Sequence, residues 1–267
     1  MVRRAFRVAY DGQDFHGFQR QPDVATVSDT ILEALRALGV IDEGVPDGYA
    51  AAGRTDAGVS ALAQTVAFEA PEWLGPAALN SELPAAVRAW ASADVLPQFH
   101  ATHDAIEREY TYHRYAPGAS VGRARDALNQ LSGEHDFHNF TPDETGTVRT
   151  VSGNIEADGD YYVITLRAGG FPRQFVRRAV TVIDAVANGA ADSDRIERLL
   201  GPAPLDGPAG VAPAPPEPLV LTGVAYPSVS FERDPRAVES LRSVFEREAI
   251  DRRTGARIAR TLADRVS

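Results

Sequence analysis

The stretch Ala51–Leu62, AAGRTDAGVSAL, contains one carboxylate, that of Asp56, two positions after Arg54. Gly53 and Gly58 flank this pair of charged residues. Glycine has no Cβ, so the backbone on both sides of the aspartate can turn tightly or let a ligand approach closely. Residues 63–70 then alternate in a pattern that favours a strand over a helix. We therefore expect Asp56 in a loop at a strand edge, where a charged carboxylate can act as nucleophile or base without a metal.

The residue types alone leave two interpretations of this loop open. An Arg-Thr-Asp run can be a turn whose aspartate caps backbone donors and whose arginine is solvated, with no chemical role. However, Gly53–Val59, GRTDAGV, resembles the signature loop of the tRNA pseudouridine synthase A family, in which the aspartate does the chemistry. Further segments resemble that family in the expected order, among them LNSELP at residues 79–84 and REYTY at residues 108–112. The resemblance ends near Pro227.

The resemblance implies roles for four side chains. Asp56 would be the catalytic residue, and Arg54 would help to extrude the target base. Tyr110, the first tyrosine of the family's Arg-x-Tyr-x-Tyr strand, would stack on the target uracil; without the resemblance it can equally be a core tyrosine. Arg177 matches the arginine of the family's Met-Val-Arg helix start and would pair with Asp56, holding it ionised and oriented. Without the resemblance, Arg177 can equally form a surface ion pair of little energetic consequence.

Two segments depart from the family pattern. Phe18 stands where a tryptophan is usual, within the loop Asp14–Pro22. The aromatic, basic and amide side chains of this loop suit stacking on RNA bases and contact with phosphates, or else they plug the core. Thr102 and His103 replace the Arg-Phe of the family's Phe-His-Ala-Arg-Phe, so an arginine contact expected there is missing or is supplied elsewhere.

The composition excludes several classes of protein. The 267 residues contain no cysteine, which excludes disulfides, thiolate nucleophiles and Cys-ligated zinc. No apolar run has transmembrane length and no signal peptide is visible, so we expect a cytoplasmic protein without a membrane partner. The net charge of −10 is unusual for a protein that binds nucleic acid. All 27 cationic residues are arginines, which suit bidentate binding of phosphate in a local cleft.

Alternating and helical patterns along the chain predict a mixed α/β order. The first half reads as strand, helix, strand, helix, strand, with helices between Thr26 and Gly39 and over Pro76–Val87. The second half has a similar order, including a hairpin over Val148–Arg167 and a last strand over Leu219–Tyr226. With the resemblance, this predicts the α+β pseudouridine synthase fold. In that fold two similar α/β subdomains share a central, mainly antiparallel sheet, with helices on one face and an active-site cleft between the subdomains.

The predicted limits are residues 1–101 for the subdomain with the catalytic loop, 102–232 for the second subdomain and 233–267 for a C-terminal helical extension. In the extension, an apolar stripe over Val238–Phe245 indicates packing against the body. Beyond the stripe lie four clustered arginines: Arg252, Arg253, Arg257 and Arg260. They form either a solvated face or a contact with an RNA backbone.

By resemblance, the chain is a tRNA pseudouridine synthase. It would isomerise uridine to pseudouridine in the anticodon stem-loop of tRNA, with positions 38 to 40 expected from the family, and it would act as a homodimer. The reaction involves no redox change and needs no external energy. We therefore expect no cofactor and no metal, with tRNA and a second copy of the chain as the partners.

Three other functions stay open at this point. A metal enzyme could use the His-x-x-His pairs His100/His103 and His135/His138, although neither pair has the glutamate of a His-Glu-x-x-His zincin. A non-catalytic tRNA-binding or chaperone protein of the same fold would need Asp56 to be dispensable. A glycoside hydrolase is disfavoured because those enzymes normally use two carboxylates and this loop offers one.

The acidic, lysine-free composition predicts a protein adapted to concentrated salt; a compositional bias of the genome is the competing explanation. At 1 M salt the Debye length is about 3 Å, so repulsion among surface carboxylates is screened. We expect the fold and the activity to be retained or gained as KCl rises from low to molar concentration. Circular dichroism measures the fold, and a tRNA modification assay measures the activity. Loss of the fold or of the activity on adding salt would contradict the adaptation.

Overall fold

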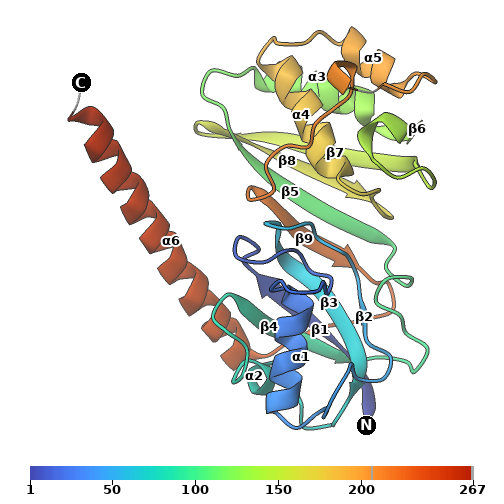
Figure 1. The fold of residues 1–267 in the computed structure, drawn as a ribbon, viewed down its shortest axis with the longest axis vertical. Coiled ribbons are helices and arrows are strands. Elements are labelled where there is room, and N and C mark those ends of the chain that lie inside the picture. Colours follow the sequence, from blue (N-terminus) through green and yellow to red (C-terminus); the bar gives the residue numbers. More distant parts are fainter. Residues whose placement is uncertain (206, 266–267) are drawn as a thin grey trace.

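The computed structural model of the chain describes residues 1–205 and 207–265. Figure 1 shows two halves stacked along the long axis, with one sheet running through both and a long C-terminal helix standing beside them. The strands are β1 Val2–Tyr10, β2 Ala50–Ala51, β3 Ser60–Ala70, β4 Val87–Asp94, β5 Glu107–Tyr115, β6 Gly133–Asp136, β7 Val148–Asp158, β8 Tyr161–Ala168, β9 Leu219–Ala225 and β10 Glu232–Arg233. The helices are α1 Val27–Ala37, α2 Pro76–Leu79, α3 Val121–Leu131, α4 Phe175–Ala187, α5 Asp194–Leu200 and α6 Pro235–Asp264, with 3-10 turns at His138–Phe140 and Gly207–Ala209.

One ten-stranded sheet joins the two halves. Its order is β10-β4-β1-β3-β9-β5-β8-β7-β6, and β2 pairs with β3 outside this path. Among the described strands, neighbours pair antiparallel except β3 and β9, which run parallel with Ser60 opposite Val220 and Ala61 opposite Leu221. The predicted α+β fold with a mainly antiparallel sheet is confirmed. The parallel pair lies where the halves meet, directly after the loop that carries Asp56.

Each half has its own hydrophobic core. In the first half α1 packs against β1 and β3, and the rings of Phe6 and Phe68 stack with centroids 5.2 Å apart. In the second half α3 and α4 pack against β5, β7 and β8. Strand β9 serves both cores, since Leu219 packs in the second and Leu221 in the first. Because β9 belongs to both cores, packing does not divide the chain at a single residue. The predicted limits of the two subdomains and of the extension stay a prediction.

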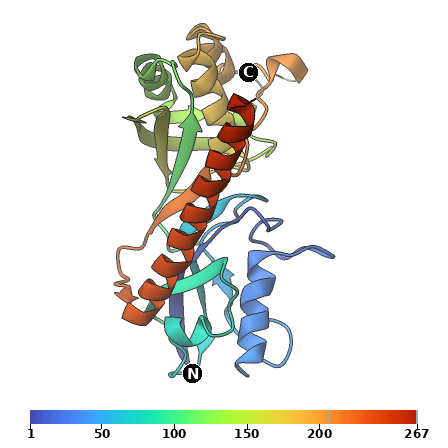
Figure 2. The same ribbon diagram turned by 90° about the vertical axis from the view of Figure 1, so that its left-hand side faces the viewer.

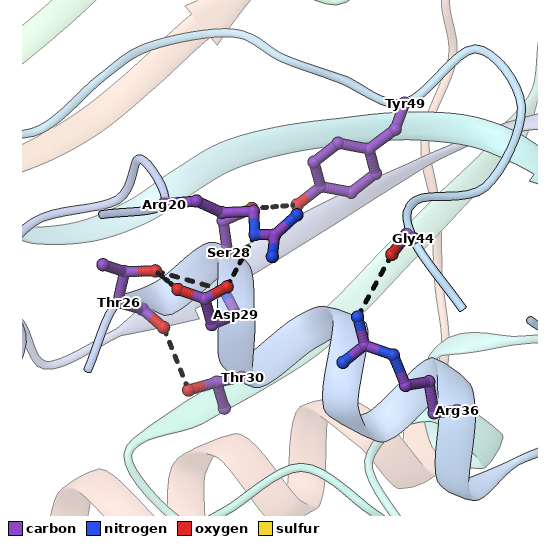
Figure 3. A network of polar contacts seen from close by, with 8 residues as sticks. All are labelled: Arg20, Thr26, Ser28, Asp29, Thr30, Arg36, Gly44 and Tyr49. Atoms are coloured by element: carbon purple, nitrogen blue, oxygen red, sulfur yellow. Dashed lines mark hydrogen bonds and ion pairs between the residues drawn. The ribbon is translucent and has the colours of Figure 1, made fainter. Parts of the chain in front are cut away.

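A network of polar contacts fixes the start of α1 (Figure 3). The hydroxyl of Thr26 accepts a hydrogen bond from the backbone N–H of Asp29 at 3.2 Å and donates to the Asp29 carboxylate at 2.6 Å. Asp29 also pairs with Arg20 at 2.7 Å, which ties the loop after β1 to the helix. The hydroxyls of Ser28 and Tyr49 lie 3.0 Å apart. The helix expected to begin after Thr26 is confirmed, with Thr26 as its N-cap.

The second helix of the first half is shorter than expected. The sequence pattern predicts a helix over Pro76–Val87 that Pro84 ends or interrupts, whereas α2 already ends at Leu79 and Val87 belongs to β4. The side chain of Asn80 explains the difference, because its amide donates to the carbonyl of Ala89 and accepts from the N–H of Ala89, each at 2.8 Å. These two bonds turn the chain back towards β4.

The structure decides between the two interpretations of Phe18, in the loop after β1. Phe18 was a candidate for stacking on RNA bases, but it is only 3% exposed. Its ring packs beside Tyr10, with 6.3 Å between the centroids. Phe18 therefore plugs the first core and offers no face to a ligand.

Helix α6 begins on the first half and then leaves the body. The carboxylate of Asp234 caps it by accepting from the backbone N–H groups of Arg236 and Ala237 at 2.9 and 3.1 Å. Its first half packs on β4 and α2, whereas residues 250–265 are exposed throughout. Figure 2 shows the helix rising from the first half to the level of the helices of the second. Neither α6 nor any other helix in the described residues is both long and apolar enough to cross a membrane.

Gly12 packs against the backbone of the loop that carries Asp56, since a Cβ on Gly12 would lie 2.1 Å from the carbonyl oxygen of Val59. Gly12→Ala must displace one of the two backbones. We expect it to lower the free energy of unfolding by about 1–3 kcal/mol, the usual cost of overpacking. Urea unfolding measures this change.

Gly122→Ala is the matched control. A Cβ on Gly122 would meet only the Ser120 hydroxyl oxygen at 3.7 Å, which is ordinary contact. Because Gly122 lies in α3, we expect no loss of stability and a gain of up to about 1 kcal/mol. Equal stability of the two variants would show that the Gly12 contact does not constrain the loop.

Candidate active site

The buried side chain of Gln64, on β3, holds the start of the loop that carries Asp56. Its amide oxygen accepts from the N–H of Gly53 at 3.2 Å, and its amide nitrogen donates to the carbonyl of Gly53 at 2.9 Å. Gln64 is 0% exposed, so these bonds form where an unpaired polar group would be costly. The amide therefore fixes the point at which the loop leaves the sheet.

Further bonds hold the middle of the loop. The hydroxyls of Tyr10 and Thr55 lie 2.8 Å apart, and both residues are buried. The carbonyl of Thr55 accepts from the backbone N–H of Phe18 at 3.1 Å. Gly58 has a φ of +80°, a conformation that residues with a Cβ rarely adopt. The backbone on both sides of Asp56 is therefore fixed, and its carboxylate lines the cleft between the two halves.

An ion pair joins Asp56 to the second half of the molecule. Arg177, in the first turn of α4, donates from Nη1 to Asp56 Oδ2 at 3.0 Å. Its Nε donates to the carbonyl of Ala214 at 2.6 Å, which sets the direction of the guanidinium group. The side chains of Arg177 and Asp56 are only 13% and 30% exposed, so water screens this pair less than a surface pair.

The pairing that the resemblance implies is therefore present, while the catalytic role of Asp56 stays a prediction. Asp56 Oδ1 has no hydrogen-bond partner within the described ranges, since Arg177 occupies only Oδ2. That oxygen is the part of the carboxylate available to a ligand.

Tyr110 lies on β5 and lines the same cleft. Its hydroxyl is 3.8 Å from the point where a Cβ on Gly53 would lie, so it is beside the loop. Its ring meets Phe171 edge-on, with 5.5 Å between the centroids. Burial, and then the negative charge of Asp56, raise the pKa of Tyr110 to about 12, with Arg108 opposing the shift. The phenol therefore keeps its proton at neutral pH.

Arg108 ties the loop region to the second half from a buried position. Its guanidinium donates to the carbonyls of Ala52 at 2.9 Å and Thr102 at 2.6 Å, and also to that of Gly169. The hydroxyl of Thr102 donates in turn to the carbonyl of Ala51 at 2.6 Å. Thr102 thus contacts the backbone at the position where the family pattern has an arginine. The guanidinium group next to Thr102 is that of Arg108.

The cleft has a volume of about 1440 Å³ and is lined from both halves. Arg54 is exposed and lines it, and no hydrogen bond or ion pair joins its guanidinium to another described residue. The structure therefore brings Asp56, Tyr110 and Arg177 together and leaves Arg54 free to contact a ligand. A carboxylate held by arginine beside a protonated phenol can act on the sugar or the ring of a base placed in the cleft.

The histidine pairs do not form a ligand set for a metal. The rings of His100 and His103 lie close, with 4.2 Å between centroids, and His135 packs edge-on against Phe137. Across residues 1–205 and 207–265, no three His, Asp or Glu side chains gather in a way that could hold a metal ion. These pairs carry no metal proposal.

Sequence reasoning missed three residues that shape the site. Gln64 had a usable signal, because it is an amide residue in a mostly apolar strand that follows the loop directly. Phe171 had a weaker one, as an aromatic residue in a Gly-Gly-Phe-Pro run that leads into a helix. Arg108 had a partial one, because it is the arginine of the REYTY segment, but the carbonyls that it binds belong to segments far apart in the sequence.

The chain is similar to proteins of known name. The family profile described as tRNA pseudouridine synthase matches residues 127–227. The tRNA pseudouridine synthase A of Haloarcula marismortui is 58% identical over 272 residues, which covers 98% of this chain and 99% of that protein. The protein of the same name in Methanosarcina acetivorans is 40% identical over 230 residues, covering 84% of this chain and 85% of its own. The one in Archaeoglobus fulgidus is 36% identical over 250 residues, covering 92% of each.

The raised pKa of Tyr110 predicts how it titrates. An unfolded tyrosine ionises near pH 10, so the folded state favours the neutral phenol. We expect the absorbance difference at 295 nm between the wild type and Tyr110→Phe to show a midpoint nearer 12 than 10. The stability that this shift contributes should be complete below pH 10 and disappear as pH rises towards 12. A midpoint at the ordinary value would contradict the burial described above.

Proposed function

The chain belongs to the tRNA pseudouridine synthase family, and on this premise we propose that Asp56 carries the isomerisation in the cleft between the two halves. The protein is an isomerase that converts uridine in tRNA to pseudouridine. The observation that carries the residue assignment is the ion pair between Asp56 and Arg177. It holds a partly buried carboxylate in the cleft with one oxygen available to the substrate.

The reaction breaks the bond between C1′ of the ribose and N1 of uracil, turns the base, and joins C5 to C1′. Asp56 can contribute by attacking the sugar covalently or by removing a proton, and its geometry is compatible with both routes. The proton lost from C5 is balanced by the one gained at N1. The step therefore consumes no oxidant, reductant or nucleotide.

The target base has to leave its stack before it can reach Asp56. Flipping a base costs a few kcal/mol, which contacts inside the cleft must offset. We assign the ring of Tyr110 to stacking on the uracil and Arg54 to the phosphates or the vacated space in the RNA. Arg177 keeps the carboxylate directed while the base is bound.

The target uridines are assigned to the anticodon stem-loop, at positions 38 to 40, and the active form is assigned to a homodimer. Both assignments are supported by the resemblance of the Gly53–Val59 loop and the segments that follow it. We also propose a cytoplasmic location, because the proposed substrate is tRNA. Mapping pseudouridines in tRNA from a deletion strain, with and without the restored protein, tests the positions directly.

Asp56→Asn keeps the size of the side chain and removes its charge. We expect the rate of pseudouridine formation to fall by about 10²- to 10⁴-fold, since amide oxygen is a poor nucleophile and base. The affinity for tRNA should change little. Release of tritium from C5-labelled uridine in tRNA gives the rate, and filter binding gives the affinity.

Asp94→Asn is the control for this change. Asp94 pairs with Arg4 at 2.6 Å at the end of β4, and its side chain is 60% exposed. This variant should keep the wild-type rate. An Asp56→Asn protein as active as Asp94→Asn would exclude Asp56 as the catalytic group.

A further inference from the structure

The two halves of α6 differ in charge and in packing. Residues 235–249 contain three arginines and three glutamates and include the part that packs on β4 and α2. Residues 250–265, here named the arm, contain five arginines and two aspartates. The arm therefore has a net charge of +3 within a chain whose net charge is −10. Every residue of the arm is exposed.

Packing does not account for the helical form of the arm. Helices of about 12–15 residues are marginal in water without tertiary contacts. Gly255 lowers the helix propensity further, by about 1 kcal/mol relative to alanine. Ile258 and Leu262 are 57% and 67% exposed, so the body does not cover its apolar side chains. A helix of this kind gains stability when it binds a partner.

Three arginines of the arm lie on one helix face. Arg253, Arg257 and Arg260 are spaced i, i+4 and i+7, which places them within one stripe along the helix. Across the described part of the chain, their guanidinium groups make no hydrogen bond or ion pair. Asp264 follows at the C-terminal end of the same stripe. The stripe therefore presents unpaired cations to solvent.

An ion pair anchors the arm to the region of the cleft. Arg252, on a neighbouring face of the helix, pairs with Asp11 at the end of β1. The N–H of the next residue, Gly12, donates to the hydroxyl of Ser60 at 3.0 Å, and Ser60 directly follows the loop with Asp56. In Figures 1 and 2 the end of the arm lies level with the helices of the second half.

We propose that the arm is a second contact surface for the RNA substrate, in which Arg253, Arg257 and Arg260 bind phosphates of the part of the tRNA outside the cleft. The inference rests on the proposed function, because it names the same substrate. A cleft that holds one base leaves most of a tRNA uncovered, and guanidinium groups match phosphates bidentately. A second protein copy meeting the arm through Ile258 and Leu262 is the competing occupant. It would leave the three unpaired arginines unexplained.

The test replaces all three arginines by glutamine, a residue of similar helix propensity, in the full-length protein. Filter binding of an unmodified tRNA transcript is measured across a series of KCl concentrations. Each lost phosphate contact reduces the slope of log Kd against log salt by about 1, so we expect a reduction of about 2 to 3 and an affinity about tenfold weaker. Arg253→Lys/Arg257→Lys/Arg260→Lys keeps the charges and should retain most of the slope.

The matched control removes the same charge from the first half of α6. Arg236→Gln/Arg242→Gln/Arg247→Gln changes three exposed arginines on the same helix. Because they lie in the charge-balanced half, this variant should change Kd less than about twofold. An equal loss in both variants would mean a general charge effect and would overturn the proposal.

Two further results would overturn the proposal. One is an arm variant with the wild-type Kd and salt slope. The other is an arm variant that loses a dimer in sedimentation while its affinity per protomer is unchanged, which would assign the arm to a second copy. Pseudouridine formation by the wild type in the same tRNA is measured separately. A wild type that binds through the arm but forms no pseudouridine would contradict the proposed function and leave this inference standing.

Discussion

The site depends on one interaction, the bond from Arg177 to Asp56. The two residues are 121 positions apart, and each is held by its own half. Gln64 and the Tyr10–Thr55 pair fix the loop on one side, and the carbonyl of Ala214 fixes the guanidinium on the other. The carboxylate is therefore correctly placed only when both halves have folded and docked.

The contacts that join the halves beside Asp56 come from a few identifiable residues. In the sheet, β3 and β9 pair over only two positions, Ser60–Val220 and Ala61–Leu221. Arg108 adds bonds from the second half to Ala52 and is nine-tenths buried, so an unpaired guanidinium there would be costly. Arg177, Arg108 and this short parallel pair thus join the two halves beside the cleft.

Patterns within the sequence predicted much of the fold. The helix between Thr26 and Gly39, the alternation in the strands and the hairpin over Val148–Arg167 are decided by neighbouring residues, and the structure confirms all three. The length of α2 could not be predicted, because the Asn80 side chain that ends it binds a residue in the next strand.

In the site, too, some features are determined by neighbouring residues and others by residues far away in the sequence. Asp56 was predicted as the catalytic residue because the segment around it resembles the signature loop of the family. The pairing with Arg177 came from resemblance alone, since no spacing rule connects residues so far apart. The burial of Phe18 and the role of Gln64 depend on which side chains surround them in three dimensions. Hydrophobic periodicity identifies a buried face, but it does not say which polar side chain on that face will hold a loop.

The late position of β9 has a consequence for how the chain is made. Leu221 and Val224 complete the core of the first half, although they lie more than a hundred residues after most of that core. A nascent chain emerging from the ribosome can therefore form α1 and its strands but cannot finish their core until residue 226 has been synthesised. Translation that stops early would yield a polypeptide with an open sheet edge at β3 and an unassembled pocket. The cleft is thus assembled only when synthesis of the chain is nearly complete.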